Sequence, residues 1–128
     1  ANVHKVDIHG CTALTIASCK SNSDNVQLLI DAGADVNHTA KKVWPPLCIA
    51  AYNGDSHVVQ LLLANGAHIH CAIKVKLVKD PLIKKGDTPL QIAQKKGHTE
   101  VVKILQEHVQ REKENNHKKE KTENCIIQ

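Results

Sequence analysis

Nine histidines and five cysteines are the residues of this 128-residue chain best suited to metal binding or nucleophilic chemistry. The densest group is His68-Ile69-His70-Cys71, because a His-x-His pair in an extended segment puts two imidazoles on one side, beside a thiol. A closed zinc site needs four ligands, and no second cluster has matching spacing. No phosphate-binding loop, paired carboxylates or nucleophile arrangement stands out. We therefore expect no metal, no cofactor, no small-molecule substrate and no enzymatic activity.

The cysteines instead indicate a cellular compartment. Their number is odd, none forms a C-x-x-C pair, and no secretory leader or long apolar span accompanies them (Cys11, Cys19, Cys48, Cys71 and Cys125). This pattern predicts free thiols in a reducing environment. We expect a cytoplasmic protein, with the nucleus as an alternative.

The last four residues, Cys125-Ile126-Ile127-Gln128, match the C-a-a-X pattern for prenylation, and the final Gln favours a farnesyl group. One prenyl chain anchors weakly, so Lys118, Lys119 and Lys121 would supply a second signal at an anionic membrane. The match counts if Gln128 is the true terminus, and the alternative is a disordered tail with a free Cys. The tail thus supports a second hypothesis, a membrane-tethered adaptor.

A lysine-rich segment from Cys71 to Lys85 alternates in character. Ile73, Val75 and Leu77 alternate with lysines, which predicts a strand with one apolar and one basic face before a turn at Asp80-Pro81. A lengthened hairpin would carry a positive rim (Lys74, Lys76, Lys79, Lys84 and Lys85). Acidic protein segments are the natural partners of such a rim. The alternative is that these lysines only keep an exposed edge strand soluble.

The net charge of +4 is unevenly distributed along the chain. Residues 1–70 carry four Lys and five Asp, whereas residues 71–128 carry thirteen Lys or Arg and eight acidic residues. Arg111 is the one arginine, aromatic residues for base stacking are nearly absent, and no groove-reading motif occurs. These features argue against nucleic acid as the partner.

The elements that position these residues repeat every 33 residues. Leu14 and Leu47, Ala17 and Ala50, and Gly33 and Gly66 each recur at that interval, which indicates a stacked array. A third copy begins at Gly86-Asp87-Thr88-Pro89-Leu90 after ten inserted residues. The chain opens within a repeat, so we expect a fragment of a longer protein.

Each repeat is predicted to contain two helices joined by a turn. Thr88 can cap a first helix, Pro89 suits its first position, and the helix should end near Gly97. A second apolar stripe follows, and Gly33 and Gly66 suit the left-handed conformation that ends such helices. With no Phe or Met, the core should consist of thin helices in close contact.

The motifs Gly86 to Ala93, Gly97 to Val102 and Gly33 to Asn37 resemble the ankyrin repeat. The resemblance implies an all-α, L-shaped solenoid with β-hairpin fingers that binds other macromolecules through its fingers and concave face, without catalysis. The expected divisions are the end of a preceding repeat (1–5), two repeats (6–38 and 39–70), an inserted finger (71–85), a capping repeat (86–109) and a charged extension (110–128).

Several positions depart from the ankyrin pattern. Its usual buried His is replaced by Thr15, Cys48 and Gln91, so the hydrogen bonds that His supports should be altered in all three repeats. Pro45 stands at the position of the capping Thr and cannot cap through its side chain. The glycine position becomes Val109, so the last helix should continue into the charged extension.

The predicted function is that of a non-enzymatic protein-interaction module. Trp44, Lys41 and Lys42 lie by register at the finger-to-helix corner, and Trp is common among interface hot spots. Trp44 could equally stack on Pro45, Pro46 or the adjacent finger and stabilise the fold. Asn37 occupies the position that accepts asparaginyl hydroxylation in the family. A further alternative is a regulatory or substrate-recruiting region of a larger enzyme or channel.

Overall fold

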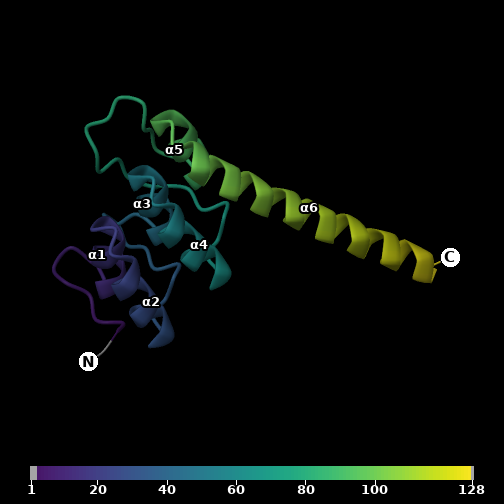
Figure 1. Ribbon diagram of the computed structural model, residues 1–128, viewed down its shortest axis with the longest axis horizontal. Coiled ribbons are helices and arrows are strands. Elements are labelled where there is room, and N and C mark those ends of the chain that lie inside the picture. Colours follow the sequence, from purple (N-terminus) through teal and green to yellow (C-terminus); the bar gives the residue numbers. More distant parts are fainter. Residues whose placement is uncertain (1–2, 128) are drawn as a thin grey trace.

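The computed structural model describes the backbone from residue 3 to residue 127 and the side chains from residue 3 to residue 113. Within that part of the chain, three helix pairs follow one another (Figure 1). The pairs are α1 (Ala13–Cys19) with α2 (Ser23–Asp31), α3 (Pro46–Asn53) with α4 (Ser56–Ala64), and α5 (Pro89–Lys96) with α6 (Thr99–Ile127). The predicted all-α solenoid of helix pairs is confirmed.

Local sequence sets where the first helix of each pair begins. The Thr88 hydroxyl accepts a hydrogen bond from the Gln91 backbone N–H, and the Gln91 side chain accepts one from the Thr88 backbone, which completes a capping box. Thr12 caps α1 through the backbone N–H of Thr15. The helix α3 follows Pro45 and has no side-chain cap, as the sequence predicts.

The turn inside each pair passes through the left-handed region. Gly54 and Gly97 adopt φ of 74° and 72° at the ends of α3 and α5, while Ser21 takes the same role after α1 with φ of 54°. Gly54 is also required sterically, because a Cβ there would lie 2.5 Å from Nδ1 of His98. His98 comes this close because its Nε2 contacts the Tyr52 carbonyl oxygen at 2.9 Å.

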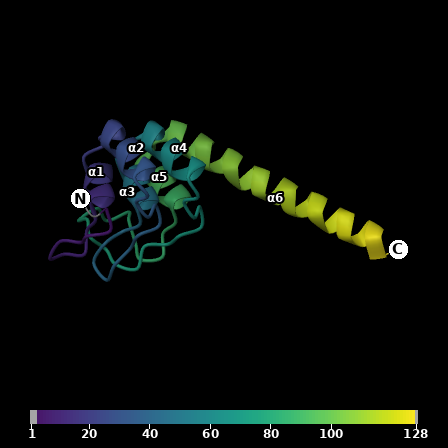
Figure 2. The same ribbon diagram turned by 90° about the horizontal axis from the view of Figure 1, so that it is seen from below.

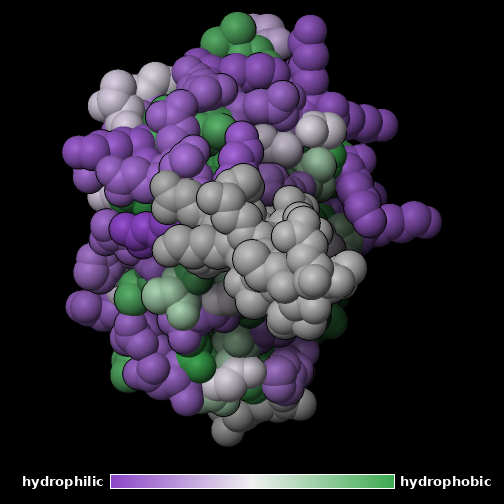
Figure 3. All heavy atoms as spheres, turned by 90° about the vertical axis from the view of Figure 1, so that its right-hand side faces the viewer, coloured by the Kyte–Doolittle hydropathy of each residue, from purple (hydrophilic) through white to green (hydrophobic). Residues whose placement is uncertain are grey.

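The helices stack in two layers, with fingers projecting from one side (Figure 2). The helices α1, α3 and α5 contact one another in sequence along the inner layer, and α2, α4 and α6 do so along the outer layer. On the face shown in Figure 3, hydrophilic side chains prevail among the coloured residues, and hydrophobic ones form small separate groups. Side chains between the layers, such as Leu14, Leu47, Leu62 and Leu105, are fully buried.

The exposed fraction of one repeated side chain falls from the first helix pair to the last. Ile16, Ile49 and Ile92 occupy one position of the repeat, and their exposed fractions are 41%, 9% and 0%. The first pair has no described pair in front of it, whereas each later pair packs against the preceding one. The same side chain is therefore surface on α1 and core on α5.

The inserted finger does not form the strand that the sequence predicts. Among the described residues, strand-like pairing is limited to an isolated bridge between Ala40 and Val43 in the preceding finger. Residues 74–85, here called the insert loop, are closed at the neck by backbone hydrogen bonds from Ile73 to Asp87 (3.0 Å) and from Gly86 to Ile73 (2.8 Å). The alternation of apolar residues with lysines predicted a hairpin with one apolar and one basic face, but within the described residues no strand pairs with this segment.

The last helix continues past the repeat, as predicted from Val109. Contacts with the outer-layer helix α4 hold the first part of α6, and the helical backbone projects from the stack as far as Ile127 (Figure 1). No helix in the described part of the chain combines the length and apolar character needed to cross a membrane.

Candidate partner-binding face

An apolar pocket of about 250 Å³ lies on the inner face of the stack. Helices α1 and α3, the finger before α3 and the insert loop each supply part of its wall. The lining residues are Cys11, Thr15, Cys19, Lys42, Val43, Trp44, Ile49, Tyr52, Asn53, Leu77 and Val78. The insert loop therefore folds back over the inner helices and forms one side of the pocket.

Trp44 is part of the interior, with 4% of its surface exposed. Its indole N–H donates a hydrogen bond of 2.7 Å to the Val75 carbonyl oxygen, and its ring meets Tyr52 edge-on with centroids 5.8 Å apart. Partner binding by Trp44 stays a prediction. The insert loop covers the ring, so the packing alternative describes its position, although one edge still lines the pocket.

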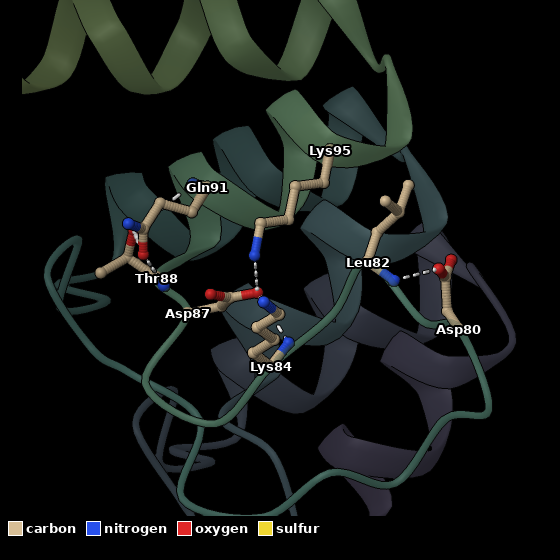
Figure 4. Close-up of polar contacts among 7 residues, drawn as sticks. All are labelled: Asp80, Leu82, Lys84, Asp87, Thr88, Gln91 and Lys95. Atoms are coloured by element: carbon tan, nitrogen blue, oxygen red, sulfur yellow. Dashed lines mark hydrogen bonds and ion pairs between the residues drawn. The ribbon is translucent and has the colours of Figure 1, made fainter.

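Ion pairs attach the insert loop to α5. The Lys95 ammonium lies 2.7 Å from a carboxylate oxygen of Asp87, which also accepts a hydrogen bond from the Lys84 backbone N–H at 2.9 Å (Figure 4). Lys96 pairs with Asp80 at 2.7 Å and lies 5.1 Å from the centre of the Tyr52 ring. The two lysines that hold the loop thus come from α5, outside the predicted rim.

The pKa of both carboxyl groups reflects these contacts. The hydrogen bond from Lys96 lowers the pKa of Asp80, with smaller contributions from the Leu82 backbone N–H and the charge of Lys76. Burial raises the pKa of Asp87, but hydrogen bonds from Lys95 and the Lys84 backbone outweigh it and leave the pKa lowered. Both groups are therefore anions that hold the loop at neutral pH.

The five lysines of the predicted rim are exposed, and so are Lys41 and Lys42 (the rim is Lys74, Lys76, Lys79, Lys84 and Lys85). The pocket brings Lys42 of one finger together with Leu77 and Val78 of the insert loop, whose neighbours in sequence are Lys76 and Lys79. Lys42 thus lines the apolar pocket, and two further exposed lysines lie next in sequence to lining residues of the insert loop. Partner binding by these residues stays a prediction.

Sequence reasoning missed several pocket residues, including Ile49, Tyr52, Leu77 and Val78. The 33-residue register carries a signal for two of them, since it aligns Ile49 with Ile16 and Tyr52 with Cys19 on the inner helices. Leu77 and Val78 lie in the insertion, where the register is interrupted. Their position depends on the long-range contacts of Trp44, Lys95 and Lys96.

The three substitutions at the usual His position make different contacts. The Thr15 hydroxyl lies 3.1 Å from that of Thr12, and Gln91 completes the capping box described above. The Cys48 thiol lies 3.7 Å from that of Cys71 at the base of the insert loop. The hydrogen bond between the thiols raises the pKa of Cys48, together with its burial, and lowers the pKa of Cys71.

The described histidines have separate surroundings. His68 and His70 are both exposed, and Nε2 of His70 lies 3.1 Å from a carboxylate oxygen of Glu112 on α6. His38 instead contacts the Gly10 carbonyl oxygen at 2.8 Å. Among the described side chains, no group of three or more His, Cys, Asp and Glu is placed to hold a metal ion.

The structure describes the surroundings of one of the two predicted modification sites. Asn37 links neighbouring fingers, since its amide donates to the Gly66 carbonyl at 3.1 Å and accepts from the His68 backbone N–H at 2.8 Å. Hydroxylation of Asn37 stays a prediction. The side chain of Cys125 lies outside the described residues, so its prenylation also stays a prediction.

Comparisons with known proteins agree with the repeat pattern. A profile of ankyrin repeats in three copies matches residues 1–73 and 47–122. The ankyrin repeat and KH domain-containing protein mask of Drosophila melanogaster is 36% identical over 101 residues, which cover 79% of this chain and 2% of that protein. The chain thus spans a small part of this relative.

Two further relatives differ in the share of their length that this chain covers and in what their names state. The putative ankyrin repeat protein YahD of Escherichia coli is 30% identical over 109 residues, covering 85% of this chain and 49% of that protein. The putative E3 ubiquitin-protein ligase XBAT35 of Arabidopsis thaliana is 32% identical over 109 residues, covering 81% of this chain and 21% of that protein.

Proposed function

Because the chain belongs to the ankyrin repeat family, we propose that it binds an acidic segment of a protein partner on its inner face. Ankyrin repeats are in general non-catalytic protein-interaction modules. The observation that carries the proposal is an apolar pocket lined by Lys42 and by Leu77 and Val78 of the insert loop, two residues that exposed lysines flank in sequence. An acidic, partly apolar surface would complement both features.

The arrangement supports an interaction surface more than a structural role for the lysines. Lysines that only protect a strand edge need an exposed strand, and residues 74–85 form a loop instead. The ion pairs that hold this loop use Lys95 and Lys96. The lysines at 74, 76 and 79 therefore remain exposed on an anchored segment, where their charge is available to a partner.

A selection of random displayed peptides tests the proposal. The unaltered module should enrich acidic peptides, and the triple variant Lys74→Glu, Lys76→Glu and Lys79→Glu should lose that enrichment. A matched control reverses three exposed lysines elsewhere, Lys20→Glu, Lys103→Glu and Lys113→Glu, and so makes the same change in net charge. If both triple variants behave alike, net charge rather than the inner face determines binding, and the proposal is wrong.

A membrane-tethered adaptor is the second candidate. The observation that favours it is the helical backbone of α6, which carries the C-terminal motif away from the stack (Figure 1). In that case Cys125→Ser should release the protein from membranes in cell fractionation, with peptide binding unchanged. An unchanged membrane fraction would exclude farnesylation at this residue as the anchor. Without the anchor, we propose a cytoplasmic location.

A recruiting role within a larger enzyme is the third candidate, and the relative named as a putative E3 ubiquitin-protein ligase favours it. The inner face would then hold a protein substrate while another domain performs the chemistry. Expression of the full-length natural protein with the Lys74, Lys76 and Lys79 reversal would test this role. Loss of modification of a bound partner would support it, and normal modification would contradict it.

A further inference from the structure

We propose that the inner-face pocket receives one large apolar side chain from the acidic segment, flanked by carboxylates that contact the lysines. This inference rests on the proposed function and makes it more specific. The pocket depends on the insert loop of this chain, since Leu77 and Val78 line it together with Ile49 and Tyr52.

The size of the pocket suits a side chain. Its volume of about 250 Å³ lies below the range of about 300–1,000 Å³ typical of sites for drug-sized molecules. A single leucine or aromatic side chain needs much less room than such a molecule. The pocket is also open on one side, which lets the backbone of a bound peptide stay outside while one side chain enters.

Three polar side chains of the wall, those of Asn53, Trp44 and Thr15, already have hydrogen-bond partners within the protein. The Asn53 amide donates to the carbonyl oxygens of Ser18 and Cys19, both at 3.2 Å. The Trp44 indole N–H is used by Val75 and the Thr15 hydroxyl contacts Thr12. The wall therefore offers few hydrogen-bonding groups to a ligand. An apolar side chain that enters the pocket gives up fewer hydrogen bonds to water than a polar side chain would.

One apolar side chain of the wall is left partly uncovered. Leu77, which lines the pocket, is 50% exposed, whereas Trp44, another lining residue, is almost completely buried. Covering such a side chain with an apolar group releases water and is favourable. The residue most suited to cover it is a leucine or aromatic residue of the partner.

Two anchors hold the segment that contains Leu77 and Val78 in place. On one side, the Val75 carbonyl accepts the hydrogen bond from Trp44, and on the other, Asp80 pairs with Lys96. The wall between them is thus ordered before a ligand arrives, which lowers the entropic cost of binding. The same short segment carries Lys76 and Lys79, and Lys42 lines the pocket together with Leu77 and Val78. Carboxylates on either side of the inserted residue would meet these charges.

Fluorescence of Trp44 reports directly on the pocket, because it is the one tryptophan of the chain. The probes are two synthetic peptides of Glu and Gly that differ at one central residue, Leu in one and Ala in the other. Titration of the Leu peptide should shift Trp44 emission and give at least about tenfold tighter binding than the Ala peptide, as expected for burial of one leucine side chain.

Matched variants in the insert loop test the wall itself. Leu77→Ser should remove most of the preference for the Leu peptide, whereas Leu82→Ser should keep it. Leu82 is 54% exposed in the same loop and does not line the pocket, so it controls for general effects on the loop. Circular dichroism verifies folding of both variants, and Val78→Ala replaces Leu77→Ser if that variant unfolds.

The outcomes separate the two proposals. Equal affinity for both peptides, with unchanged Trp44 emission, would overturn the pocket inference and leave the lysine rim as the binding surface. If neither peptide binds, while the displayed-peptide selection also yields no acidic sequences, the proposed function is wrong as well. A preference for Leu that survives Leu77→Ser and Val78→Ala would place the apolar contact elsewhere and contradict the inference.

Discussion

Two neighbouring fingers of this molecule, residues 35–45 and residues 68–88, are held in different ways. In the shorter finger, the Thr39 hydroxyl donates to the Val43 carbonyl at 2.7 Å, and Ala40 and Val43 form a bridge. Its His38 contacts Gly10 in the preceding finger. The longer finger has backbone hydrogen bonds of its own at the neck, and side chains from other elements hold it in addition, namely Trp44, Lys95 and Lys96.

This difference shows how a repeat protein accommodates an insertion. A finger of ordinary length can be fixed by its own turn and by the neighbouring finger. Ten extra residues exceed what these contacts can hold, so buried side chains and ion pairs from the helices supply the rest. The longer finger should therefore respond more strongly than the shorter one to core substitutions, acid and loss of single hydrogen bonds.

The largest effect is expected from Ile83→Ala, which empties a fully buried position in the insert loop. We expect the free energy of unfolding to fall by about 2–5 kcal/mol, from lost burial and a residual cavity. Denaturant unfolding measures this change. Leu82→Ala, at the exposed neighbouring position, should change stability by less than about 0.5 kcal/mol. Equal effects of both changes would mean that the loop is not packed.

Trp44→Phe should separate the two fingers most directly. It removes the indole N–H that binds the Val75 carbonyl and some buried ring area, which should cost about 1–3 kcal/mol. Hydrogen exchange should accelerate in residues 74–85 and stay unchanged in residues 39–43. Faster exchange in both fingers would contradict the separate anchoring of the insert loop.

Asp87→Asn should weaken the neck of the longer finger in a pH-dependent way. We expect a loss of about 1 kcal/mol at neutral pH, since solvent partly screens the contact with Lys95. The pKa of Asp87 is lowered in the folded protein. Its stabilising effect is thus complete above the unfolded pKa of about 3.9 and is lost as pH falls through the folded pKa.

Thermal unfolding across that acidic range checks the Asp87 prediction. The stability difference between the unaltered protein and the Asn variant should shrink as the solution becomes more acidic. Lys95→Gln should give the same trend, because it removes the partner of the same carboxylate. A difference that stays constant with pH would assign the effect of the substitution to something other than the charge.

The smallest effect on stability, but a clear chemical one, is expected at the base of the longer finger. The hydrogen bond from Cys48 lowers the pKa of Cys71, so iodoacetamide should alkylate Cys71 at lower pH than a free thiol and before Cys48. Peptide mass spectrometry measures the order. Cys48→Ala should move the alkylation midpoint of Cys71 to higher pH, and an unchanged midpoint would contradict the thiol contact.

Much of the helical framework could be predicted because its signals are local. Thr88, Pro89 and Gly97 define the ends of α5 through capping and backbone conformation, and each acts within one or two turns. Pro45 likewise indicates a missing cap before α3. Spaced repetition then allows the register of one pair to be transferred to the next.

The candidate site could be predicted less completely. The alternation of residues in the insertion identifies its lysines, which are exposed, and partner binding by them stays a prediction. The strand was not formed, because alternation of Ile73, Val75 and Leu77 specifies two faces but supplies no partner strand. Trp44 was singled out for its residue type, which carries no information about its surroundings. Its burial depends on the insert loop, whose position no local sequence rule predicts.

The amino-acid sequence by itself determined the repeat, the helix ends, the altered His positions and the concentration of positive charge after residue 70, because each depends on residue type or short spacing. The tertiary structure decided that the insertion folds back as a loop, that Trp44 binds a carbonyl 31 residues away, and that Lys42 and Leu77 share one pocket. These contacts form because the stacked helices bring segments that are distant in sequence close together. Local sequence patterns therefore do not predict them.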